Sequence, residues 1–203
     1  MIEVFKPVRY GILIGLLVFI LGIGWAFFLV LGHEKIHESL QYEAAHAASI
    51  KGDVNGGEHD MSMDGHMKKG GDGMEDHLHG AVQAREAAHA GLHDNLLMAL
   101  SHARLVRGHV HAMGLGLVTI AVSLGLAFTS VSARIKTIAS ALTGVGALVY
   151  PVAWIVMGYR TPALGPEGAE LSVMTIAGTG VSLVLLGVLT SAAFIIKDIF
   201  KKS

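Results

Sequence analysis

The chain has 203 residues, 52% of them hydrophobic, and its formal net charge is −1. It contains no cysteine, which excludes disulfides, thiolate zinc sites, iron–sulfur clusters and covalently attached c-type haem. Any bound metal must therefore be held by His, Met, Asp or Glu, and this apolar, nearly neutral composition indicates a membrane protein with no nucleic-acid partner.

Four uncharged runs are each long enough to cross a bilayer, which takes about 20 helical residues. The first run has no signal-peptide cleavage site and is too long for a signal-peptide core, so we interpret it as a retained anchor. The predicted fold class is therefore an all-α integral membrane protein with four transmembrane helices in the lipid bilayer. The predicted divisions are a cytoplasmic N-terminus and first span (1–32), an outer segment (33–108), spans at 109–133, 137–159 and 171–196, connections at 134–136 and 160–170, and a tail (197–203).

Basic residues gather at one set of span ends: before the first span, in the turn 134–136 and in the tail 197–203. The loop 160–170 carries one basic and two acidic residues instead. The positive-inside rule then predicts a multi-pass protein of a bacterial-type inner (cytoplasmic) membrane, with both termini cytoplasmic and segment 33–108 periplasmic. No ionisable residue lies within the uncharged runs, which disfavours ion-coupled transport.

All twelve histidines fall within or directly beside the outer segment, between His33 and His111. Residues 33 to about 50 and about 80 to 108 have helical sequences, so we expect them to extend the first two spans as an antiparallel helical hairpin. Between them, residues 51–80 are rich in Gly, Asp, Met and His and have few apolar residues to bury, which predicts a flexible tip.

The tip carries two kinds of metal ligand. Thioether sulfur prefers Cu(I), whereas imidazole accepts copper in either charge state and also zinc. In composition the tip resembles the Met/His-rich tracts of periplasmic copper-handling proteins, and the alternative interpretation is a hydrophilic linker. The candidate ligands, called here the His/Met tract, are His59, Met61, Met63, His66, Met67, Met74, His77 and His79.

The tetrapeptide Glu-Ala-Ala-His occurs twice, once in each helical part of the outer segment. The spacing of Glu43 to His46, and of Glu86 to His89, places carboxylate and imidazole on one helix face, as in di-iron helical bundles. A possible second metal site follows from this spacing. A solvated, alanine-rich helix face is the other interpretation.

Residues 33–37 read His-Glu-Lys-Ile-His, which matches the short zinc-protease signature. We disfavour proteolysis, because Lys35 and Glu38 place charges where such active-site helices carry uncharged residues, and no later motif completes the site. The sequence favours a protein that is not an enzyme without deciding the question.

A second group of histidines is predicted at the membrane face. His33 ends the first span, and His109 and His111 begin the second on the same side. His37 lies one turn above His33, and His102 lies two turns above His109. These five imidazoles predict a ladder from water to the membrane surface that binds a copper or zinc ion.

Haem b is the alternative cofactor at the same place. It would be ligated by His33 with His109 or His111, and its propionates would pair with Arg104 or Arg107. Histidines resting at an interface without a cofactor are the third interpretation.

The sequence therefore favours a membrane-anchored, extracytoplasmic transition-metal-binding protein, copper preferred, that captures or delivers metal or loads a partner membrane complex. The alternative is a haem-b-binding electron-transfer subunit, or a structural subunit, of a respiratory membrane complex. In each case we expect other membrane subunits or further copies of this chain as partners.

Overall fold

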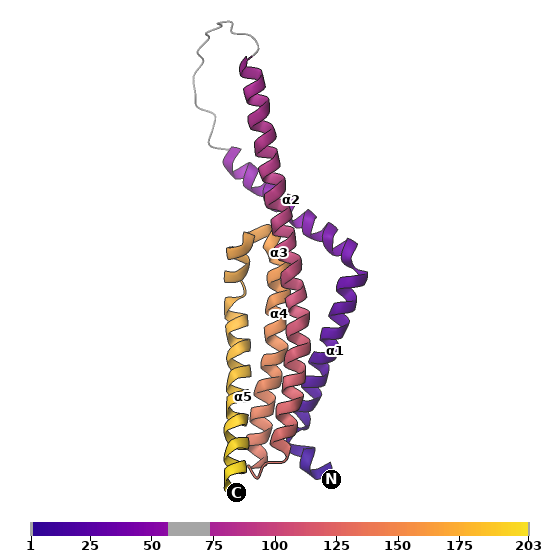
Figure 1. Ribbon diagram of the computed structural model, residues 1–203, viewed down its shortest axis with the longest axis vertical. Helices are drawn as coiled ribbons and strands as arrows, with labels where there is room; N and C mark the ends of the chain where they lie inside the picture. The colour runs from indigo at the N-terminus through magenta and orange to yellow at the C-terminus, as the bar shows by residue number, and fades with distance from the viewer. Residues whose placement is uncertain (1, 57–73, 203) are drawn as a thin grey trace.

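The computed structural model describes residues 2–56 and 74–202, with side chains described for 3–46 and 95–201. The described residues are helical throughout, apart from short connections, and contain no strand. The elements are η1 (Ile2–Val8), α1 (Arg9–Leu31), α2 (His33–Gly56), α3 (Met74–Ala127), α4 (Ala133–Leu171) and α5 (Met174–Lys202) (Figure 1).

Four stretches are long and apolar enough to cross a membrane, as the sequence predicted. They are Glu3–Leu31, Asn95–Ala127, Ala133–Leu171 and Met174–Lys201. In Figure 1 they form an elongated bundle in which α4 contacts α1, α3 and α5, and both termini lie at the same end. We call the opposite end, which carries α2 and the extension of α3, the distal end.

Small residues allow the helices to approach closely. A Cβ added to Gly146 of α4 would lie 2.6 Å from the carbonyl oxygen of Gly180 in α5, and one added to Gly15 of α1 would lie 3.0 Å from that of Gly116 in α3. Close approach of this kind is the usual way for transmembrane helices to associate, because lipid gives them no hydrophobic driving force. The bundle core is therefore set by backbone proximity at these glycines.

The chain bends at Gly32, between α1 and α2. A Cβ at this position would lie 2.7 Å from the carbonyl oxygen of Phe28, so the bend requires glycine. Beyond it, α2 runs obliquely across the distal end in Figure 1 instead of continuing the axis of α1. Ile36 and Leu40 are buried there against Leu105 of α3. The first part of the outer segment thus differs from the predicted hairpin arm, and most of the predicted tip lies outside the described residues.

The distal part of α4 also differs from the sequence prediction. Residues 160–170, predicted as a loop, are helical on both sides of a break at Gly165, whose φ of 74° is in the left-handed region that favours glycine. The break turns the last residues of α4 back toward α5. It lies beside α3, which carries several of the candidate site residues.

Candidate metal centre

Three of the predicted ligands come together at the distal end. His33 is the first residue of α2, and its ring centroid lies 6.0 Å from that of His37, one turn later. On the other side, the ring of His33 lies 5.6 Å from that of His102 in α3. The bend at Gly32 brings this about, because it turns the start of α2 toward α3.

Two neighbouring cavities lie beside these rings. The first has a volume of about 370 Å³ and is lined by His33, His37 and His102, together with residues including Asn95 and Met98. The second has a volume of about 420 Å³ and is lined by His33, His102 and His109. The two cavities therefore share His33 and His102, and His109 extends the imidazole-lined surface toward the middle of the bundle.

The ring separations are close to those of imidazoles on a single metal ion. A metal–nitrogen bond of about 2.0–2.1 Å places two ring centres about 5 Å apart on a tetrahedral ion. The observed 5.6 and 6.0 Å are within about one ångström of that value, a difference that small side-chain rotations cover. Within residues 3–46 and 95–201, no three His, Asp or Glu side chains already form a closed metal-binding group, so binding requires such rotations.

The neighbouring helices hold the three histidines in place through apolar packing and two hydrogen bonds to carbonyl groups. Beneath α2, Leu29, Ile36, Leu40 and Leu105 form a buried apolar cluster. The indole Nε1 of Trp25 in α1 donates to the carbonyl oxygen of Leu105 at 3.1 Å. Ser101, next to His102, donates to the carbonyl oxygen of Gly158 in α4 at 2.6 Å. These contacts fix the rotation of α3 and therefore the direction of His102.

His109 also faces this region. Its Nδ1 atom is buried and has no hydrogen-bond partner in the structure, and its ring lines the second cavity. A buried imidazole nitrogen without a partner is costly, because it has lost its water and gained nothing in return.

The structure places His111 elsewhere. Its ring packs 5.1 Å from that of Tyr150 and 5.6 Å from that of Trp154, both in α4. His109 and His111 are two residues apart, which is about 200° around a helix, so they cannot share one face. The predicted common ligand sphere of His33 and His111 is therefore not formed.

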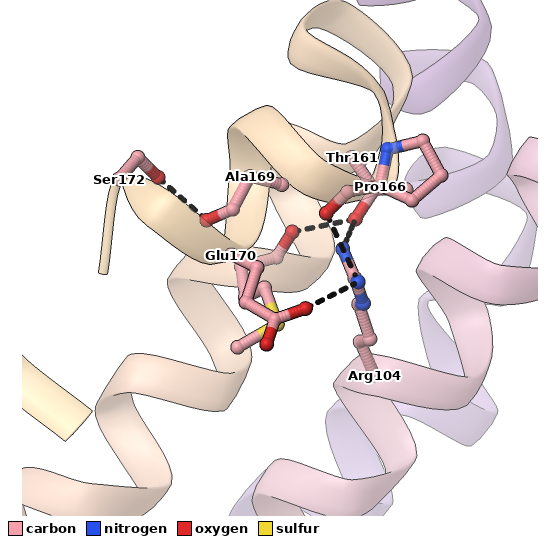
Figure 2. A network of polar contacts seen from close by, with 7 residues as sticks. Arg104, Thr161, Pro166, Ala169, Glu170 and Ser172 are labelled. Atoms are coloured by element: carbon pink, nitrogen blue, oxygen red, sulfur yellow. Dashed lines mark hydrogen bonds and ion pairs between the residues drawn. The ribbon is translucent and has the colours of Figure 1, made fainter. Parts of the chain in front are cut away.

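Arg104 has a structural role that the sequence did not suggest. Its side chain is buried and donates to Thr161 Oγ1 at 2.9 Å and to the carbonyl oxygen of Pro166 at 3.2 Å, and it lies 4.0 Å from the carboxylate of Glu170 (Figure 2). These partners lie on both sides of the break at Gly165, so Arg104 holds that break against α3. Two prolines and a glycine between 162 and 166 were the available signal for an irregular segment.

Arg107, the other residue predicted to bind haem propionates, is exposed. Its guanidinium carbon lies 5.4 Å from the ring centroid of Trp154. Both arginines are thus on the α4 side of α3, whereas His33 and His109 line the cavities on its other side.

The remaining candidates are only partly described. His46 stacks on Tyr42, with ring centroids 6.1 Å apart, and Glu43 is exposed nearby. Glu34, which would be the base of a zinc protease, is exposed and lines neither histidine cavity. His59, Met61, Met63, His66 and Met67 lie outside the described residues, as do the side chains of Met74, His77, His79, Glu86 and His89.

The fold and these cavities define a helical membrane protein with four candidate spans and an imidazole-lined surface at one end of its bundle. Comparisons with protein-family models, curated proteins and solved structures gave no match.

Proposed function

We propose that this protein is a membrane-anchored, extracytoplasmic protein that binds a transition-metal ion, copper preferred, through His33, His37 and His102. The observation that carries the proposal is the position of His33 between the other two imidazoles, beside a cavity of about 370 Å³. Neutral imidazole is a ligand for Cu(II) and Zn(II) alike.

The His/Met tract supports a role in capture and delivery. It follows α2 in the chain and includes the first residues of α3, and its thioethers are soft ligands suited to Cu(I). Copper captured by the tract as Cu(I) would pass, without a change of oxidation state, to the three imidazoles at the distal end, with His109 as the next ligand below. We propose that the metal is then loaded into a partner membrane complex or into another copy of this chain.

A metal ion is better supported than haem b. The pair His33 and His111 is separated by the body of α3, and the guanidinium of Arg104 is already bonded to Thr161 and Pro166. His33 and His109 remain as a possible haem pair, but the structure offers no free basic side chain beside them for propionates among the residues lining that cavity.

The stoichiometry of bound metal tests the proposal. In a variant that carries serine at all eight positions of the His/Met tract, we expect one Cu(II) or Zn(II) per chain after equilibrium dialysis, measured by elemental analysis. The parent protein should bind additional Cu(I). A folded variant that binds no metal, or purified protein with a haem Soret band, would contradict the proposal.

We also propose that both termini are cytoplasmic and that the distal end is periplasmic, from the distribution of Lys and Arg. Because the chain has no cysteine, single cysteines introduced at the exposed positions Gln41 and Lys201 can be labelled without background. A membrane-impermeant maleimide should label Gln41→Cys in intact spheroplasts, and Lys201→Cys only after lysis. The reverse pattern would place the metal centre in the cytoplasm.

A further inference from the structure

A third cavity, with a volume of about 350 Å³, lies between α3, α4 and α5. It is on the α4 side of α3, away from the three histidines of the metal centre. Its wall includes Arg104, Met157 and Met174 toward the distal end, and Arg107, Trp154, Gly178 and Val181 farther along the bundle. It takes no part in the function proposed above.

Among the residues that the structure describes, the charges at this cavity leave Arg107 without an anionic partner. Arg104 is paired with Glu170 at 4.0 Å, which also lines the cavity. Arg107 has no acidic side chain within ion-pair distance among the described residues. It lies over the ring of Trp154, a position that holds its guanidinium at the cavity wall. The cavity therefore has a net positive charge that an anion would neutralise.

The polar donors of this wall also lack protein acceptors. Within residues 3–46 and 95–201, no hydrogen bond engages the guanidinium of Arg107, the indole Nε1 of Trp154 or the hydroxyl of Tyr150. A few polar groups converging on a mostly apolar cavity are typical of a site that orients a ligand. The ligand must supply acceptor oxygens at the arginine end.

The other end of the cavity is apolar and open to the surroundings of the bundle. Val181, the lining residue of α5 farthest from the distal end, is 38% exposed. A Cβ added to Gly178 would meet no atom within 4 Å. Arg107 is the last charged residue of α3, so the cavity extends from the charged distal ends of the helices into their uncharged spans. A molecule that fills this cavity must therefore have a charged group at one end and an apolar chain at the other.

We propose that this cavity binds an anionic phospholipid. Its phosphate is held by Arg107, because guanidinium donates two parallel hydrogen bonds to phosphate oxygens. One acyl chain lies along Trp154, Gly178 and Val181. Basic pockets between transmembrane helices bind lipid headgroups in this way.

Quenching of Trp154 fluorescence by brominated acyl chains tests the proposal. The chain has two tryptophans, so Trp25→Phe leaves Trp154 as the only one. This protein is placed in nanodiscs of phosphatidylcholine with phosphatidylglycerol as the minor lipid. Two samples are compared, one with brominated phosphatidylglycerol and one with brominated phosphatidylcholine, at the same mole fraction of brominated lipid. We expect brominated phosphatidylglycerol to occupy the site with about fivefold preference, the contribution of one basic residue near an anionic headgroup.

Two arginine variants distinguish lipid binding in the cavity from a general effect of surface charge. Arg107→Gln should abolish the preference, whereas Arg160→Gln, which removes an exposed charge elsewhere at the distal end, should leave it unchanged. Gly178→Leu fills the apolar end and should reduce quenching by phosphatidylglycerol while Arg107 is intact. Equal quenching by the two lipids in the parent, or an equal loss of preference in both arginine variants, would overturn the proposal.

Inorganic phosphate distinguishes a lipid from a soluble anion. An excess of phosphate in the buffer should not reduce the preference, because it has no acyl chain to fill the apolar end. If phosphate removes the preference both in the parent and in Arg160→Gln at equal ionic strength, the Arg107 site takes a soluble anion and the proposal fails. If an added lipophilic quinone quenches Trp154 while brominated phosphatidylglycerol does not, the cavity binds another ligand and the proposal also fails.

Discussion

Replacing His33 and His102 together with alanine is expected to weaken Cu(II) binding on the order of 100-fold or more, in the variant whose His/Met tract carries serine. The centroids of the two rings lie 5.6 Å apart and the rings come from different helices, so their loss leaves only His37 of the three proposed ligands. A single imidazole on an exposed helix holds Cu(II) weakly. Competition with a chromophoric chelator measures the affinity in detergent solution.

The control for this loss is His111→Gln in the same background. It removes an imidazole from the same helix, α3, but on the face that packs against Tyr150 and Trp154. Affinity should stay within about twofold of the parent, since no proposed ligand is touched. If His111→Gln weakens binding as much as the double change, the ligands are not those that the structure brings together.

Replacing Gly146 with leucine is expected to lower the free energy of unfolding by about 3 kcal/mol or more. A Cβ at this position would lie 2.6 Å from both the carbonyl oxygen of Gly180 and the backbone nitrogen of Val184. Both obstacles are backbone atoms, so no side-chain rotation relieves the clash, and α4 must move away from α5. Unfolding in mixed micelles of increasing SDS content, followed by circular dichroism, measures the change.

Gly24→Leu is the matched control for this change. Gly24 lies in α1, and a Cβ added there would meet no atom within 4 Å. The substitution adds the same side chain to a helix surface that faces lipid, so the free energy of unfolding should hardly change. Equal destabilisation by both substitutions would mean that leucine is harmful for reasons other than the contact between α4 and α5.

The spans could be predicted from the sequence because a bilayer imposes one simple requirement, a long uncharged helix. The direction of α2 could not be predicted from the sequence. Its helical sequence is compatible with a straight continuation of α1, and the bend depends on Gly32 and on burial of Ile36 and Leu40 against a distant part of the chain. The helical structure around Gly165 was missed for a similar reason, since Arg104 of α3 stabilises it.

The candidate site was predicted in part. His33 and His37 are one turn apart in the sequence, and His102 and His109 share a face because seven residues are nearly two turns. Those relations hold within single helices and need no tertiary information. His111 was grouped with them from its depth along the span alone, whereas its direction around α3 turns it toward Tyr150 and Trp154.

X-ray absorption at the copper edge identifies the atoms bound to the metal and so tests the proposed ligands themselves. With the His/Met tract replaced by serine and one Cu(II) bound, we expect nitrogen ligands at about 2.0 Å with the outer-shell scattering of three imidazoles. In His33→Ala that number should fall to two, and in His111→Gln it should remain three. A spectrum with oxygen ligands and no imidazole scattering would contradict the proposal that His33, His37 and His102 form a metal centre.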